Sequence, residues 1–171
     1  MKENILIVDD EPDIRDVISV ILNDEGYNTN CVSNAQEAQA KINIEIPSLI
    51  ILDIWMRDST MDGLSLLNWI KDSNPEIPVL MISGHGTVEI AVNAIKAGAY
   101  DFIEKPFKSE KLLFMVSRAL ENSELKKENE ELKQQVRRTD MIVGKSSIIN
   151  SVRQTIATVS YTHLRAHETV V

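Results

Sequence analysis

Short apolar runs alternate along residues 4–106 with longer segments whose apolar residues recur every three or four positions. The runs are almost continuously hydrophobic, which is typical of strands that are buried on both faces of a parallel sheet. The pattern predicts five strands, at residues 4–10, 27–33, 49–54, 78–83 and 101–106.

The segments between these runs have the spacing of helices. Pro12 suits the first turn of a helix that Gly26 ends, and its apolar positions are Ile14, Val17, Ile18, Ile21 and Leu22. The second helix is expected to start after a capping Asn34 and to carry Ala35, Ala38 and Ile42. The third starts near Gly63 and uses Leu64, Leu67 and Ile70.

A fourth helix is predicted from Thr87, with one apolar side made of Val88, Ala91, Val92 and Ile95. Gly98 stands where a left-handed C-terminal cap is expected, and Ser109 is the predicted cap of a long final helix. Strands that alternate with helices in this way indicate an α/β fold, a doubly wound parallel sheet with helices on both faces.

In such a sheet, functional residues gather where the strands end. The residues at the predicted ends are Asp9, Asp10, Asp53, Ser83 and Lys105. A single aspartate at a strand end is more often a helix cap or a turn residue, but here three carboxylates are expected to meet at one edge. They would raise one another's pKa unless a cation compensated, and Mg²⁺ prefers oxygen ligands of this kind.

Pro106 follows the strand-end lysine directly. Proline restricts the backbone at this point and admits the cis peptide form.

Four motifs resemble the response-regulator receiver family: Ile-Leu-Ile-Val-Asp9-Asp10-Glu-Pro, Leu-Ile-Ile-Leu-Asp53-Ile, Met-Ile-Ser83-Gly-His-Gly and Phe102-Ile-Glu-Lys105-Pro-Phe. The resemblance covers roughly residues 3–120. It implies a flavodoxin-like (βα)5 fold with strand order 2-1-3-4-5.

The resemblance also implies roles for individual residues. Asp53 would accept a phosphoryl group from a sensor histidine kinase, and Asp9, Asp10, Asp53 and the backbone carbonyl of Trp55 would hold Mg²⁺. Ser83 and Lys105 would contact the phosphoryl group. The switch residues would be Ser83, Phe102 and Pro106. Such a protein takes part in its own phosphorylation and is not a substrate-turnover enzyme.

The residues alone leave three other interpretations of the function open. A flavin-binding module would need a Ser/Thr/Gly-rich loop after the first strand, where this chain has Asp-Asp-Glu-Pro. A degenerate receiver, acting only in interaction or dimerisation, would lack the phosphoacceptor or the lysine. A small Mg²⁺-dependent phosphatase would need a second nucleophile or an acid/base partner.

The loop after Asp53 departs from the family pattern. Arg57 stands where receivers usually have proline, and the segment from Asp53 to Gly63 is two residues longer than usual. The longer loop resembles nitrogen-regulation regulators of the NtrX type.

Beyond the receiver, residues 121–138 predict a helical linker with five acids and five bases. The 4, 3, 4 spacing of a short two-stranded coiled coil is present in this linker at Leu125, Asn129, Leu132 and Val136. A homodimer through the linker and a receiver face is therefore expected. A single solvated helix fits the linker sequence nearly as well. Residues 139–159 resemble the opening of the AAA+ domain of sigma-54-dependent activators. Residues 160–171 match no such continuation and look non-native.

Charge and composition agree with this division. The chain has a net charge of −8, and residues 1–120 have 19 acids against 10 bases. An acidic surface disfavours nucleic acid, so DNA and sigma-54 polymerase would be partners only of missing output domains. With one cysteine and no apolar run of about 20 residues, the sequence predicts a cytoplasmic protein without a membrane span.

Overall fold

The computed structural model describes residues 3–57 and 59–145, with side chains up to residue 138. Five parallel strands form one sheet in the order β2-β1-β3-β4-β5. The strands are β1 (Asn4–Val8), β2 (Asn28–Val32), β3 (Leu49–Asp53), β4 (Val79–Ser83) and β5 (Asp101–Glu104). The predicted α/β fold and strand order are confirmed.

Five helices connect and follow the strands, in alternation with them. They are α1 (Pro12–Asp24), α2 (Ala35–Ile44), α3 (Gly63–Ser73), α4 (Val88–Lys96) and α5 (Ser109–Lys145). The side chain of Asn34 accepts a hydrogen bond from the Glu37 amide at 2.9 Å, as expected of an N-terminal cap. Gly26 and Gly98 both have positive φ, of 88° and 99°, which explains glycine at these two helix ends.

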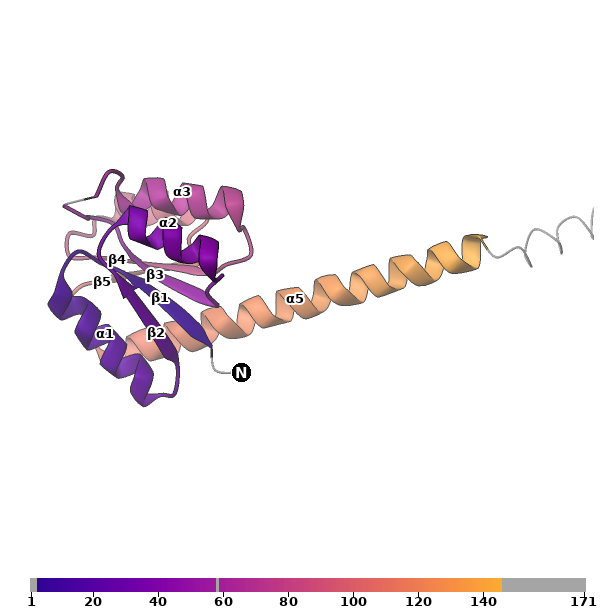
Figure 1. Ribbon diagram of the computed structural model, residues 1–171, viewed down its shortest axis with the longest axis horizontal. Helices are drawn as coiled ribbons and strands as arrows, with labels where there is room; N and C mark the ends of the chain where they lie inside the picture. Colours follow the sequence, from indigo (N-terminus) through magenta and orange to yellow (C-terminus); the bar gives the residue numbers. More distant parts are fainter. Residues whose placement is uncertain (1–2, 58, 146–171) are drawn as a thin grey trace, which may run out of the picture. The chain divides into compact units, whose positions relative to one another are not determined.

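The helices cover both faces of the sheet (Figure 1). Alternate residues of each central strand point to opposite sides, so the sheet has two hydrophobic layers. Leu6, Val8, Ile50 and Leu52 pack with α2, α3 and α4. Ile5, Ile7, Leu49 and Ile51 pack with α1 and the first part of α5. This double burial explains why the strands read as continuous apolar runs.

Several observed strands are shorter than predicted. β1 ends at Val8 and β5 ends at Glu104, so the polar residues that follow them lie just beyond the sheet, at the start of loops. Ser109 is the first residue of α5, and the carbonyl of Lys108 accepts the first hydrogen bonds of the helix. Ser109 as the cap was therefore wrong by one position.

Helix α4 packs through a different side from its apolar stripe. Ala94 is buried and Ile90 and Ala97 pack against the core. Three residues of the stripe are instead exposed, with exposed fractions of 82% for Val88, 44% for Val92 and 46% for Ile95. An apolar face on α4 is thus open to solvent.

The chain forms two units, residues 1–125 and 126–171. The first unit contains the sheet and the packed part of α5. In the second, the described residues from Lys126 on continue as helix, and its side chains up to Arg138 are exposed. No helix in the described part of the chain is long and apolar enough to span a membrane.

Candidate phosphoacceptor and metal site

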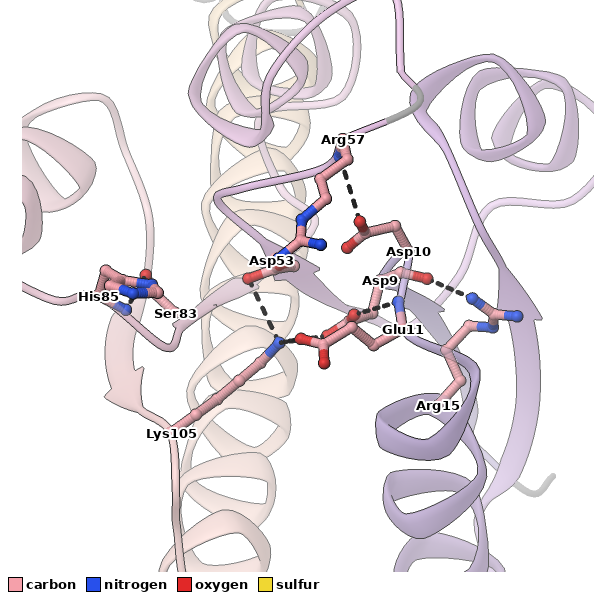
Figure 2. Close-up of polar contacts among 9 residues, drawn as sticks. All are labelled: Asp9, Asp10, Glu11, Arg15, Asp53, Arg57, Ser83, His85 and Lys105. Carbon is pink, nitrogen blue, oxygen red and sulfur yellow. Dashed lines mark hydrogen bonds and ion pairs between the residues drawn. The ribbon is translucent and has the colours of Figure 1, made fainter.

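Three acids meet at the carboxyl end of the sheet. Asp9 and Asp10 directly follow β1, and Asp53 is the last residue of β3, the neighbouring strand. One carboxylate oxygen from each lies within 4.8 Å of the others. Figure 2 shows these side chains together with Lys105, which extends toward them from the end of β5. The predicted convergence of strand ends is present.

Lys105 is the cation at the centre of this group. Its Nζ lies 2.7 Å from Asp9 Oδ2, 3.4 Å from Glu11 Oε1 and 3.6 Å from Asp53 Oδ1. Burial alone would lower the pKa of Lys105, but the Asp9 hydrogen bond and the nearby carboxylates raise it above its usual value. The lysine is therefore held in its charged form.

Of these acids, Asp53 has the least favourable environment for its charged form. It is 3% exposed, and Oδ1 is a buried oxygen without a hydrogen bond. The pKa of Asp53 is raised to about 7, mainly by burial; Lys105 opposes this rise, and the charges of Asp9 and Asp10 contribute to it. Lys105 at 3.6 Å is an ion-pair partner too distant to satisfy Oδ1 as a donor.

Asp9 is fully buried, but unlike Asp53 it accepts hydrogen bonds at both carboxylate oxygens. Its Oδ1 accepts from the Glu11 amide at 2.9 Å and its Oδ2 from Lys105. Burial nevertheless raises its pKa, because these hydrogen bonds offset only part of the desolvation.

The acids present fit a hard divalent cation. The group offers several carboxylate oxygens, one of them an unsatisfied buried oxygen. Burial is the main cause that raises the pKa values of Asp9 and Asp53, and a bound cation would favour the charged form of both carboxylates. Oxygen-only ligand sets of this kind suit Mg²⁺.

Ser83 closes β4 next to Asp53. In the register of these strands Asp53 is paired with Ile82, so Ser83 lies one residue further along the same edge. Its buried Oγ accepts from the His85 amide at 3.2 Å, and its carbonyl accepts from the Lys105 amide at 2.8 Å. The hydroxyl still has a proton to donate.

Phe102 is connected to the Ser83 loop by a packing contact. A Cβ placed on Gly86 would lie 2.8 Å from Cζ of the Phe102 ring, so the ring packs directly on the backbone of this loop. Phe102 is half-buried against the core. The Lys105–Pro106 peptide bond is cis.

The loop after Asp53 returns tightly to the strand. A Cβ on Gly63 would lie 2.1 Å from the Asp53 carbonyl oxygen, so only glycine fits there. The Gly63 amide donates to the Ile54 carbonyl at 2.9 Å. Trp55, whose carbonyl was expected to bind metal, begins this loop, with its side chain 52% exposed.

Three contacts at the site were not foreseen from the sequence. Glu11 pairs with Lys105, the Arg15 Nη1 donates to the Asp9 carbonyl at 2.6 Å, and the Arg57 amide donates to Asp10 Oδ2 at 3.2 Å. Of these three residues, only Arg57 was distinctive in the sequence, because it replaces the proline that receivers usually have. The other two depend on how α1 starts beside the sheet.

Comparison with known proteins decides the family. The profile of the response regulator receiver domain matches residues 5–117. The chain belongs to this family. Receiver domains are signalling modules that bind Mg²⁺ at an acidic pocket, and this receiver has such a cluster of aspartates.

The receiver is similar to NtrX proteins. It is 51% identical over 165 residues to the nitrogen assimilation regulatory protein NtrX of Azorhizobium caulinodans, a match that covers 96% of this chain and 36% of the relative. The crystal structure of the NtrX receiver domain from Brucella abortus is 56% identical with a TM-score of 0.67, covering 68% of this chain and 98% of that one.

A more distant match is the solution structure of the beryllofluoride-activated NtrC4 receiver domain dimer. It is 42% identical with a TM-score of 0.67 and covers 70% of this chain and 98% of that one. Against the Azorhizobium regulator, this chain spans about a third of the relative's length.

Proposed function

We propose that this receiver accepts a phosphoryl group on Asp53 from a phosphohistidine of a sensor histidine kinase. The observation that carries the proposal is the buried Asp53 carboxylate, with Lys105 3.6 Å away and two further acids beside it. Transfer to a carboxylate needs a positioned nucleophile and cations that neutralise the phosphoryl oxygens. These residues can meet both needs.

In the transfer, a carboxylate oxygen of Asp53 forms a bond to phosphorus while the bond from phosphorus to the donor imidazole breaks. The imidazole nitrogen keeps the electron pair of that bond, and the product is an acyl phosphate. Lys105 is already charged and beside Asp53, so it can neutralise a phosphoryl oxygen without a large rearrangement. The Ser83 hydroxyl can donate to another.

Mg²⁺ is the proposed cofactor, held by the carboxylates of Asp9, Asp10 and Asp53 and by the Trp55 carbonyl. When bound, the ion supplies positive charge at the phosphoryl oxygens. It also favours the carboxylate form of Asp53, which the raised pKa of this group otherwise disfavours near neutral pH.

Phosphorylation is proposed to act through Ser83, Phe102 and Pro106. A hydrogen bond from Ser83 to the phosphoryl group would pull the loop that contains Gly86, on which the Phe102 ring packs. Movement of the ring would change the surface beside α4. A two-state element of this kind is what a phosphorylation switch requires.

The switched surface is proposed to form a homodimer. The α4 stripe exposes Val88, Val92 and Ile95, and the related NtrC4 receiver domain is described as a dimer in its activated form. Residues 121–138 would add a coiled-coil contact. We expect Phe102→Ala to abolish phosphate-induced dimerisation in ultracentrifugation, and equal dimerisation of mutant and wild type would contradict this switch.

We propose that the output of the switch corresponds to the part of the related regulators that this chain does not span. Residues 1–120 are proposed as the receiver, 121–138 as the linker and 139–159 as the start of an AAA+ domain, while 160–171 are not assigned to either; residues from 146 on lie outside those the structure describes. Transcription regulation through sigma-54 polymerase and DNA, and hence a cytoplasmic location, would belong to the whole regulator.

The proposal is tested by mass spectrometry after incubation with acetyl phosphate and Mg²⁺. We expect a gain of one phosphoryl group in the wild type and in Asp16→Asn, which changes an exposed acid on α1, and no gain in Asp53→Ala or Asp53→Asn. No gain in the wild type would instead favour a degenerate receiver that works by interaction alone.

A further inference from the structure

Arg57 forms a contact with the acidic pocket that the usual residue at this position could not form. Its backbone amide donates a hydrogen bond to Asp10 Oδ2 at 3.2 Å. Proline has no amide hydrogen, so this bond exists only because the family's usual proline is replaced. The replacement thus attaches the loop after β3 to one of the proposed metal ligands.

The loop is also held in place at described residues after Arg57. On the far side, Ser59 Oγ accepts from the Ala35 amide at 3.0 Å, at the first turn of α2, and Thr60 bonds to the side chain of Gln36. The loop then ends at Gly63 against the backbone of Asp53. These attachments restrict where the Arg57 side chain can reach.

The guanidinium group of Arg57 points back toward the pocket. Figure 2 shows the side chain folding from the loop toward Asp53 and Asp10. The residue is exposed, and its guanidinium makes no ion pair or hydrogen bond within the part of the chain that the structure describes. Its donors are therefore available for an anion that enters the pocket.

The charge balance of the pocket favours such a role. Lys105 is already shared among Asp9, Glu11 and Asp53. A phosphoryl group on Asp53 adds negative charge to this acidic surrounding, so a further cation is favourable. Arginine suits phosphate oxygens because its planar group donates two parallel hydrogen bonds.

We propose that Arg57 is a second protein cation for the phosphoryl group on Asp53, aimed by the bond between its own amide and Asp10. This inference rests on the proposed function of Asp53. The same charge would repel Mg²⁺ while no phosphoryl group is present, since both cations face the same acids. Arg57 would thus favour the phosphorylated state over the state that binds Mg²⁺ alone.

Two affinities with opposite expected changes test this role. The first is that of beryllofluoride, a phosphoryl mimic, at saturating Mg²⁺, and the second is that of Mg²⁺ alone, both by calorimetry on the full chain. In Arg57→Gln we expect beryllofluoride to bind about threefold to tenfold more weakly, as for loss of an exposed charge-assisted hydrogen bond. Mg²⁺ alone should bind slightly more tightly, by up to about threefold.

Two variants serve as controls. Arg57→Lys retains the charge and should keep beryllofluoride affinity within about threefold of the wild type, the cost of losing the planar group. Lys96→Gln removes the same charge from an exposed position at the end of α4 and should leave both affinities unchanged. Melting by circular dichroism confirms that each variant is folded.

Three results would overturn the inference. Equal beryllofluoride affinity in Arg57→Gln and the wild type, with Asp53 still phosphorylated, removes the role of Arg57 and leaves the proposed function intact. If Arg57→Gln binds both beryllofluoride and Mg²⁺ more weakly than the wild type, Arg57 only supports the structure of the loop. Failure of the wild type to bind beryllofluoride and to take up phosphate contradicts the proposed function, and the role of Arg57 with it.

Discussion

At the scale of single residues, the chemistry of this receiver is concentrated in one buried carboxylate. Asp53 combines near-complete burial, an unsatisfied oxygen and a pKa raised to about 7. These properties destabilise the ionised, ligand-free protein and make the site receptive to cations. Natural proteins commonly accept such local costs where function requires them.

The raised pKa predicts how stability depends on pH in metal-free buffer. The folded state holds a proton on Asp53 up to about pH 7, whereas the unfolded state loses it near 3.8. Stability therefore falls as the pH rises through this interval and stays reduced above it. Asp53→Asn lacks this loss, so its advantage over the wild type should grow between pH 5 and pH 8 by at most about 2.7 kcal/mol, since about two pH units of the interval lie in this range.

Urea denaturation in EDTA at pH 5 and pH 8 measures this difference, with Asp16→Asn as the exposed control. An advantage of Asp53→Asn that is the same at both pH values would contradict the assignment of the raised pKa to Asp53.

A metal prediction follows from the same group of acids. A ligand that binds only the folded state adds about 2.7 kcal/mol to stability when present at 100 times its Kd. We expect Mg²⁺ to raise the melting temperature of the wild type, and EDTA to reverse this. Asp10→Asn should show a smaller shift because it removes one proposed ligand, whereas an identical shift would exclude Asp10 from the metal site.

At the scale of elements, loops rather than strands decide how the site is completed. The segment between β3 and α3 brings Arg57 beside the pocket and returns at Gly63, where there is no room for a side chain. The segment between β4 and α4 brings Gly86 under the Phe102 ring. Both loops depend on close approach of backbone and neighbouring groups, which glycine permits.

Gly63→Ala tests the closure of the first loop. Its Cβ would lie 2.1 Å from the Asp53 carbonyl oxygen, so β3 or α3 must shift. We expect a loss of at least about 2 kcal/mol in the free energy of unfolding and weaker Mg²⁺ binding. Gly84→Ala is the matched control, because no atom lies within 4 Å of its Cβ and stability should change by less than about 0.5 kcal/mol.

At the scale of the whole molecule, the question is how one receiver contacts another. The side chains at the proposed coiled-coil positions are exposed, with exposed fractions of 58% for Leu125, 55% for Leu132 and 61% for Val136. Such a row fits a helix that pairs through this side, as proposed for the linker. The α4 stripe is a second exposed apolar surface in the same chain.

Leu132→Glu tests the linker contact. The change places a charge in the proposed seam, so we expect self-association in sedimentation experiments to weaken about tenfold or more. Gln134→Glu adds the same charge outside the seam and should behave like the wild type. If both variants self-associate as the wild type does, the linker has no part in dimerisation.

The local sequence pattern specifies the fold and which strand-end residues meet at one edge of the sheet. Alternating apolar runs and helical segments specify a parallel sheet, and in such a sheet strand ends such as Asp9, Asp53 and Lys105 must lie at the same edge. Sequence patterning could reach this far because it depends on local periodicity and on general rules of topology.

Tertiary packing sets the features that depend on distance and burial. It turned the apolar stripe of α4 to solvent, joined the Arg57 amide to Asp10 and placed Gly86 under Phe102. It also raised the pKa of Asp53 to about 7. Each of these features depends on which groups far apart in the chain come into contact and on how much water they exclude. The local sequence pattern encodes neither the long-range contacts nor the exclusion of water.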